Sequence, residues 1–167
     1  MPTSDNQRIK ITSLKITTPS PTMNTNDITI EQMRKIKSLA RFKDEELAEF
    51  LHFVELTPCA HDTELFHEGN PGDAMFLILE GQMQVYTEKP DGDIEVLKVL
   101  HTGEAFGDLA LFYHTKRAAS VKALKDSLLL KLTATALENL TAKQAGLASK
   151  FLFSLANSLS QMYAHHK

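Results

Sequence analysis

A chain of 167 residues with 43% hydrophobic residues can bury one hydrophobic core and is short for several domains. Its 18 basic and 21 acidic residues nearly cancel, without the concentrated basic face of a typical nucleic-acid-binding protein. The single cysteine, Cys59, excludes an internal disulfide, and no apolar run has the length of a membrane span or of a secretory signal. These properties predict a cytoplasmic protein that contacts neither nucleic acid nor membrane directly.

The N-terminal residues 1–27 are rich in Thr, Ser, Asn and Pro, a composition that buries little apolar surface and predicts a flexible arm. Within this arm, apolar and polar residues alternate over residues 8–17, which is the period of a β-strand. Such a strand would pair with an exposed sheet edge of this chain or of a neighbour. Both interpretations stay open here, as does the choice between Met1 and Met23 as the first residue.

Helical signals follow the arm. Thr29 and Gln32 have the spacing of a capping box, and apolar residues then recur at helical intervals as far as Ala40. Asp44 is placed to cap a second helix. The inward face of that helix would carry Leu47, Phe50, Leu51 and Val54.

After Pro58 the hydrophobic period changes to two, which is the period of β-strands. Residues that favour turns, such as Gly, Asn, Asp and Pro, separate the short apolar segments. Regularly spaced short strands with Gly-rich turns are typical of a small β-barrel or jelly roll. Six strands are expected, at residues 64–67, 75–79, 82–88, 94–100, 119–124 and 128–132.

From about residue 135 the helical period returns and predicts two C-terminal helices, with a break or a close approach at Gly146. Such a helix packs its apolar stripe either on the chain's own barrel or on a second copy. A homodimer is preferred, because Phe151 and Phe153 fall on different sides of the helix. The stripe that would form the dimer seam consists of Ala148, Leu152, Leu155, Leu159 and Met162.

The most informative stretch, residues 106–121, reads F-G-D-L-A-L-F-Y-H-T-K-R-A-A-S-V. It predicts a short helical turn after Gly107 and Asp108, whose first backbone N–H groups are free to hold an anion. The guanidinium of Arg117 can close on the same anion through charge-assisted hydrogen bonds. Because an arginine buried without an anion is costly, a pocket that receives an anion is preferred over a closed pocket in which Arg117 pairs with Asp108.

This stretch resembles the phosphate-binding cassette of the cyclic nucleotide-binding domain family, of the catabolite activator and protein kinase A regulatory subunit type. A second stretch, L-F-H-E-G-N-P-G-D-A-M-F-L-I-L-E-G at residues 65–81, matches the family in the spacing of Gly69, Gly72 and Gly81. The two motifs follow one another between matching helices, and the resemblance extends over residues 29–163. The chain is similar to the sensor domain alone, because too few residues follow the last helix for a helix-turn-helix module.

The resemblance implies a mainly β fold with flanking helices: an eight-stranded β jelly roll (a double-stranded β-helix) with N-terminal helices and a C-terminal helix pair. The chain would divide into a flexible arm (1–27), a ligand-binding core with the first helices (28–133) and C-terminal helices (134–167). The implied function is a regulatory sensor in which a cyclic nucleotide moves the last helix and changes a protein–protein interaction. The alternatives are a degenerate domain that binds only protein partners, and a truncated regulator that forms heterodimers.

Carried over residue by residue, the resemblance implies that Arg117 pairs with the exocyclic oxygens of the cyclic phosphate. Asp108 stands where the family's glutamate accepts a hydrogen bond from the ribose 2′-OH. Met162 or Tyr163 would fall over the nucleobase as a lid. The other implied ligand contacts are Gly81, Val85, Phe106, Gly107, Leu109, Ala110, Ala118 and Ala119.

Two positions depart from the family's pattern. Asp108 is one methylene shorter than glutamate, which withdraws its carboxylate by about one C–C bond, ~1.5 Å. Lys116 replaces the usual proline and gives up a rigid turn. We therefore expect an intact grip on the phosphate and a loosened grip on the sugar.

The sequence says less about the nucleobase, metal binding and catalysis than about the phosphate contacts. Ala118 lacks the hydroxyl that the family associates with guanine, so the expected ligand is cyclic AMP in preference to cyclic GMP, without a further cofactor. The seven histidines lack the close H-x-H or H-x3-H spacing of metal ligands, so no metal site is expected. There is no G-x-S-x-G motif either, and the sequence predicts no enzyme.

Overall fold

The computed structural model describes residues 8–10, 15–16, 27–113 and 115–164. The N-terminal part contains β1 (Arg8–Lys10), β2 (Lys15–Ile16), β3 (Asp27–Thr29), α1 (Ile30–Arg34), η1 (Lys37–Leu39), α2 (Asp44–Phe50) and η2 (Leu51–Phe53). The central part contains β4 (Glu55–Cys59), β5 (Glu64–Phe66), β6 (Ala74–Glu80), β7 (Gln82–Glu88), β8 (Ile94–His101), β9 (Ala105–Phe106), α3 (Leu109–Phe112), β10 (Ser120–Ala123) and β11 (Ser127–Thr133). Two helices close the chain, α4 (Ala134–Lys143) and α5 (Ala145–Ala164).

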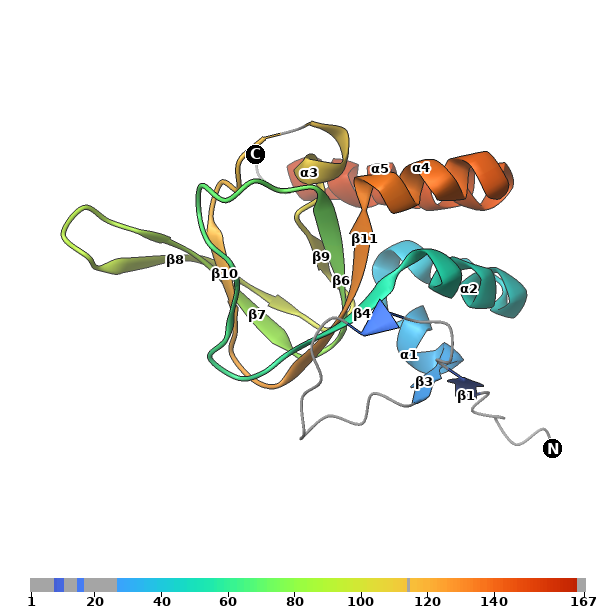
Figure 1. Ribbon diagram of the computed structural model, residues 1–167, viewed down its shortest axis with the longest axis horizontal. Helices are drawn as coiled ribbons and strands as arrows, with labels where there is room; N and C mark the ends of the chain where they lie inside the picture. The colour runs from blue at the N-terminus through green and yellow to red at the C-terminus, as the bar shows by residue number, and fades with distance from the viewer. Residues whose placement is uncertain (1–7, 11–14, 17–26, 114, 165–167) are drawn as a thin grey trace.

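The central strands form two facing sheets. One sheet has the strand order β5-β10-β7-β8, and the other has the order β2-β4-β11-β6-β9. The helices gather on one side of the sheets, while the β7–β8 hairpin extends away on the other side (Figure 1). With the eight strands β4 to β11 between N-terminal and C-terminal helices, the predicted mainly β jelly roll is confirmed.

The six predicted strands are present as β5, β6, β7, β8, β10 and β11, and β7 has the predicted bounds, Gln82–Glu88. The sequence does not predict β4 (Glu55–Cys59), because the alternating period of the strands begins only after Pro58. Pro58 pairs with Leu128 of β11, whereas β2 reaches only Glu55 and Leu56 on the other side of β4. At Pro58 the outer edge therefore has no described neighbour, and an edge position tolerates a residue without an N–H.

The N-terminal helices differ from the expectation in two ways. The capping box at Thr29 and Gln32 is confirmed, with hydrogen bonds of 2.8 and 3.0 Å. The predicted continuous helix, however, ends at Arg34, and a separate 3-10 turn follows. The backbone is extended at Ile36, and the next residue's N–H donates to the carbonyl of Gly103 at 3.0 Å. This contact with a distant turn is the reason for the break.

Asp44 was predicted to cap α2, which is wrong. It is the first helical residue, and its side chain makes no cap. Its carboxylate instead accepts a hydrogen bond from Arg34. The exposed backbone N–H of Lys43, the residue before the helix, donates to the carboxylate of Glu46 at 2.9 Å.

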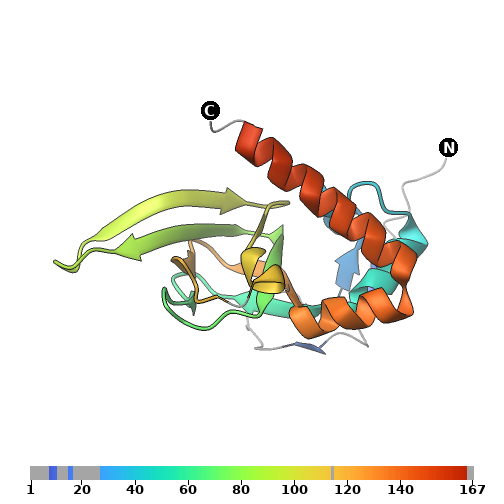
Figure 2. The ribbon, with the colours of Figure 1, turned by 90° about the horizontal axis from the view of Figure 1, so that it is seen from above.

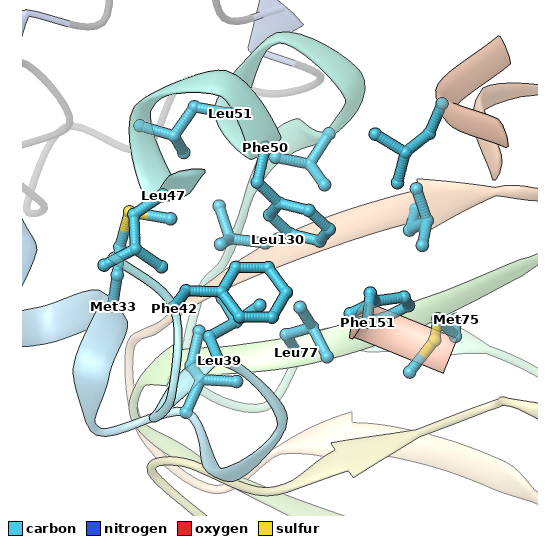
Figure 3. Packing of buried hydrophobic residues seen from close by; sticks show 14 of the residues in the cluster. Met33, Leu39, Phe42, Leu47, Phe50, Leu51, Met75, Leu77, Leu130 and Phe151 are labelled. Atoms are coloured by element: carbon cyan, nitrogen blue, oxygen red, sulfur yellow. The ribbon is translucent and has the colours of Figure 1, made fainter. Parts of the chain in front are cut away.

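The main hydrophobic core lies between the helices and the β4-β11-β6 sheet. Phe50 of α2 contacts both Phe42 and Phe151 of α5, at ring-centroid distances of 6.1 and 5.1 Å. Figure 3 shows these three rings packed against Leu77 and Leu130 from the sheet. All five side chains are fully or almost fully buried, so the helices are fixed to the sheet by apolar burial.

Helix α5 packs its apolar stripe on its own chain. Ala148 and Leu155 are buried in the main core, and Leu152 and Leu159 pack partly against it. Ala148 and Leu155 thus cover the chain's own core and are not available to a dimer seam in this structure, whereas a homodimer through the rest of the stripe stays a prediction. The fifth residue, Met162, lies on α5, but its side chain is outside the described residues.

Two further features of the C-terminal helices are the break between them and a hydrogen bond to α2. The break between α4 and α5 falls at Gln144, two residues before the predicted Gly146, which lies inside α5. Lys150 of α5 donates a hydrogen bond of 2.7 Å to Glu46 of α2, and this bond lowers the pKa of Glu46. It ties the last helix to the N-terminal helices.

Two short pieces of the predicted arm are described, and both pair as strands. β1 runs antiparallel to β3, with Ile9 opposite Ile28. β2 lies parallel to β4, with Ile16 opposite Leu56. These pairings agree with the added-strand interpretation of residues 8–17; the rest of the arm lies outside the described residues, and the division of the chain at residue 27 stays a prediction. Within the part that is described, no helix is long and apolar enough to span a membrane.

Candidate functional site

The backbone of Arg117 is held by the turn that joins β5 to β6. Its N–H donates to the carbonyl of Asn70 at 2.7 Å, and its carbonyl accepts from the N–H of Gly69 at 2.8 Å. The preceding residue, Lys116, forms a β-bridge with Pro71. The glycine-rich turn of the second sequence motif thus fixes the arginine of the first.

The side chain of Arg117 lies on an aromatic cluster. Its guanidinium carbon is 4.1 Å from the ring centroid of Phe66 and 5.9 Å from that of Phe76, distances at which a cation interacts with an aromatic face. The Phe76 and Phe106 rings are stacked at 5.3 Å, and Phe66 lies 6.0 Å from Phe76. Of these three rings, the sequence predicted only Phe106 as part of the site.

Hydrogen bonds satisfy Arg117 only in part. Its Nη2 donates to the carbonyl of Ala74 at 2.9 Å. Its Nε is buried and has no hydrogen-bond partner among the described residues. Burial lowers the pKa of Arg117, while the charge of Asp73 raises it. A half-buried guanidinium with an unpaired N–H is a group that gains from an anion.

Two glycines leave room for this side chain. A Cβ on Gly72 would lie 2.6 Å from Nε of Arg117, and a Cβ on Gly107 would lie 2.9 Å from Nη1. Both distances are too short for a stable contact. Gly107 also has a φ of +79°, which other residues rarely adopt. The structure therefore brings Arg117 and Gly107 together, as the cassette motif predicts.

The turn after Gly107 is already partly bonded to itself. The N–H of Ala110 donates to the carbonyl of Gly107 at 3.2 Å, and the N–H of Leu111 donates to that of Asp108 at 3.1 Å. Ala110 is buried, whereas the Leu109 side chain is exposed. The backbone of Leu109 and of Ala110 is expected to line the ligand. The N–H of Ala110, however, is already used in the hydrogen bond to Gly107.

Asp108 lies at the N-cap position of α3 without capping it. Its carboxylate has no hydrogen bond or ion pair among the described residues, so the predicted alternative of an Arg117–Asp108 pair is not seen here. Asp108 instead lines a groove of about 730 Å³. One wall of this groove is α5, from Phe153 to Gln161, and the opposite wall includes the end of β8 and η1.

Of the remaining predicted site residues, some lie in the aromatic cluster and others do not. Val85 is buried in the same cluster as Phe106, and Ala119 packs partly against it. Ala118 is exposed beside Arg117. The side chains of the predicted lid residues, Met162 and Tyr163, are outside the described residues.

Gly81 is not brought to Arg117. In the β7–β10 ladder Ser120 pairs with Tyr86, and Ala123 pairs with Met83. Arg117 precedes one end of this ladder and Gly81 lies beyond the other. Gly81 instead turns between β6 and β7, where its N–H donates to Thr102 at 3.1 Å and a Cβ would collide with Ser127. Its spacing therefore reflects a tight strand connection.

A polar network next to β10 was not predicted. Nδ1 of His67 is 2.8 Å from Glu64 and 3.3 Å from Oγ of Ser120, and Tyr86 donates to Glu64 at 3.0 Å. A catalytic serine, histidine and carboxylate would use both ring nitrogens of the histidine, whereas here one nitrogen faces both partners. The network therefore has the geometry of a structural tie. Among the described residues no three His, Cys, Asp or Glu side chains are grouped to hold a metal ion.

Comparison with known families gives this chain its family. The family model "Cyclic nucleotide-binding domain" matches residues 58–144, which is more than half of the chain and runs from the end of β4 through the Arg117 region to the end of α4. The chain therefore belongs to the cyclic nucleotide-binding domain family.

Solved structures agree with this assignment. The N-terminal domain of a transcriptional regulator from Streptomyces coelicolor A3(2) superposes with a TM-score of 0.69 at 29% identity, over 81% of this chain and 95% of that one. A cyclic nucleotide-binding domain from Methylobacillus flagellatus superposes with a TM-score of 0.70 at 27% identity, over 81% and 76%. The cAMP-bound structure of PfPKA-R has a TM-score of 0.55 at 27% identity, over 65% and 39%.

The curated relatives that match are much longer proteins. The chain is 27% identical over 86 residues to lysophospholipase NTE1 from Chaetomium globosum, a match that covers 52% of this chain and 6% of that protein. It is 31% identical over 87 residues to an uncharacterized ABC transporter ATP-binding protein of Mycobacterium tuberculosis, covering 44% of this chain and 26% of that protein. The family's domain is thus a small part of proteins with diverse names.

Proposed function

We propose that this chain is a cytoplasmic regulatory domain, without catalytic activity of its own, that binds a cyclic nucleotide between Arg117 and Asp108. The observation that carries the proposal is the guanidinium of Arg117, half-buried against Phe66 beside Gly107 with its buried Nε unpaired. A cyclic phosphate is a compact anion that would supply the counter-charge and accept hydrogen bonds from the guanidinium N–H groups that Ala74 leaves free. Charge-assisted hydrogen bonds of this kind are about twice as strong as neutral ones.

The sugar would lie next to Asp108. Its carboxylate has no partner among the described residues, and it lines the groove beside α5. A carboxylate accepts hydrogen bonds from hydroxyl groups, so the 2′-OH of a ribose fits this position. The shorter side chain would leave the bond long or bridged by water, which makes the affinity lower than a glutamate would give.

The base is proposed to be adenine. Ala118, beside Arg117, has no hydroxyl to offer to the 2-amino group of guanine, and the cAMP-bound neighbour shows that a similar fold takes cyclic AMP. Direct titration with cyclic AMP and cyclic GMP tests this choice.

The response of the domain to ligand binding would be a movement of α5. The helix forms one wall of the groove that Asp108 lines, whereas Arg117 does not line this groove. A ligand that extends from Arg117 past Asp108 would contact the helix and favour one of its positions over another. The shift would expose or hide a surface for a protein partner. Lys150, Ala148 and Leu155 fix the first half of the helix, whereas Leu159 in the second half packs only partly on the core, so the second half is the part proposed to move.

Amide hydrogen exchange tests this movement. Saturating cyclic AMP is expected to change exchange at least severalfold in residues 156–164 of α5 and to leave residues 147–155 unchanged, because those amides lie over the buried core. The β4 and β11 amides serve as internal controls. Uniform protection over the whole of α5, or no change after Leu155, would contradict a ligand-driven shift of the helix end.

A protein-interaction domain that binds no nucleotide is the second candidate. It is favoured by one observation: the short helix α3 and the residue after it expose Leu109, Phe112 and Tyr113, by 64, 56 and 72%. Three large apolar side chains within five residues are unusual for a surface that meets only water. Failure of both cyclic nucleotides to bind at millimolar concentration would support this candidate over the sensor.

A further inference from the structure

Strand β8 (Ile94–His101) leaves one of its edges without a partner. It is the last strand in the order β5-β10-β7-β8, so among the described strands only β7 pairs with it. Figure 2 shows the tip of the β7–β8 hairpin extending away from α4 and α5, whereas the C-terminal end of β8, from Lys98, faces α5 across the groove. An unprotected edge strand presents a row of backbone donors and acceptors to another strand.

The outer strand also exposes apolar side chains. Ile94, Val96 and Leu97 are 51, 50 and 52% exposed. They account for three of the seven large hydrophobic side chains that are exposed in the described part of the chain. Exposed apolar side chains on an unpaired edge strand favour pairing with another strand.

A β-bulge arranges the charges of β8 on one face. Val85 pairs with Lys98 and Tyr86 pairs with Val96, so Leu97 is an extra residue. Glu95 and Lys98 are three positions apart and would point to opposite faces of a regular strand. The extra residue places both on one face, and neither has an ion-pair partner among the described residues.

The other face of the strand carries the apolar side chains. Ile94, Val96 and Val99 pair with Glu88, Tyr86 and Gln84, which alternate along β7 and so share a face. Counted outward from Val96 without the extra residue Leu97, the strand carries Glu95 and then Ile94 toward its N-terminus, and Lys98 and then Val99 toward its C-terminus. This order is self-complementary when the strand meets an antiparallel copy of itself.

We propose that a second copy of this chain pairs with this edge, β8 against β8, about a two-fold axis at Val96. If Leu97 of each copy stays an extra residue in the new ladder, as it is opposite β7, Glu95 of each copy lies opposite Lys98 of the other, and Ile94 lies opposite Val99. Opposite charges and apolar pairs directly across an antiparallel ladder each stabilise it. The two four-stranded sheets become one continuous sheet, with the same patch used on both copies, as two-fold symmetry requires. A bulge commonly turns an edge strand away from such pairing, but here it is what aligns the two charges.

Charge reversal tests this interface. Sedimentation equilibrium of the wild-type chain at low salt is expected to show a monomer–dimer equilibrium that weakens as salt is added. Glu95→Lys and Lys98→Glu should each raise the dimer dissociation constant about tenfold, because each places like charges opposite one another twice. Glu138→Lys, the same charge change on the exposed face of α4, should leave it unchanged.

A mixture of the two single variants provides the decisive comparison. Each contact between a Glu95→Lys copy and a Lys98→Glu copy pairs opposite charges, so heterodimers should form as readily as the wild-type dimer. The double variant with both changes should dimerise again by itself. A wild-type chain that stays monomeric at its highest soluble concentration, or a mixture that dimerises no better than the separate variants, would overturn the proposal.

Discussion

Replacing Arg117 by alanine is expected to weaken cyclic AMP binding at least a hundredfold. The side chain supplies the positive charge at the site, and the loss of charge-assisted hydrogen bonds to a phosphate costs about 3 kcal/mol. The fold should survive, because the aromatic rings of Phe66, Phe76 and Phe106 still pack on one another without the guanidinium. Isothermal titration calorimetry measures the affinity, and thermal unfolding checks the fold.

Two matched variants show whether the effect belongs to this arginine. Lys116→Ala removes a neighbouring charge that is exposed to solvent, and it should change the affinity by only a few fold. Arg117→Lys keeps the charge but loses the planar donor group that lies on Phe66, so its affinity should fall between those of the wild type and the alanine variant. An alanine variant that binds as tightly as the wild type would show that the ligand lies elsewhere.

Lengthening Asp108 to glutamate is expected to tighten cyclic AMP binding. The added methylene extends the carboxylate by about 1.5 Å toward the sugar. A restored hydrogen bond between a charged group and the 2′-OH is worth about 1.5–3 kcal/mol, which is about ten- to a hundredfold in affinity. Titration calorimetry of the variant beside the wild type measures the gain.

The comparison ligand for this variant is 2′-deoxy cyclic AMP, which lacks the hydroxyl. The gain of Asp108→Glu should disappear with it, whereas Asp108→Asn should weaken cyclic AMP binding only slightly, because the proposed bond from the aspartate to the sugar is long. A glutamate variant that binds no more tightly than the wild type would mean that Asp108 does not face the sugar.

Elements with a local sequence signal were predicted correctly, whereas elements that depend on distant contacts were not. The alternation of apolar residues along β7 is local, and it gave that strand's bounds correctly. The break between α1 and η1 depends on the distant turn at Gly103, and β4 contains a proline that only its edge position permits. The stripe on α5 shows a different limit. An apolar helix face looks the same whether it covers its own core, as Leu155 does, or a second copy.

The site was predicted only in part, because the cassette motif is a local signal and the contacts that support it are not. The cassette motif identified Gly107, Asp108 and Arg117, which are close in sequence. The contacts that hold the arginine come from afar: Phe66 supports its guanidinium and Ala74 accepts its hydrogen bond. These residues lie more than forty positions away, in a pairing that only the folded sheet defines.

The central claim, that this domain binds a cyclic nucleotide, is tested most directly by titrating the wild-type chain with cyclic AMP and, separately, with cyclic GMP. The account predicts saturable binding of one ligand per chain, tighter for cyclic AMP, with an affinity that falls when Arg117 is replaced. Absence of a binding signal for both ligands at millimolar concentration would contradict it.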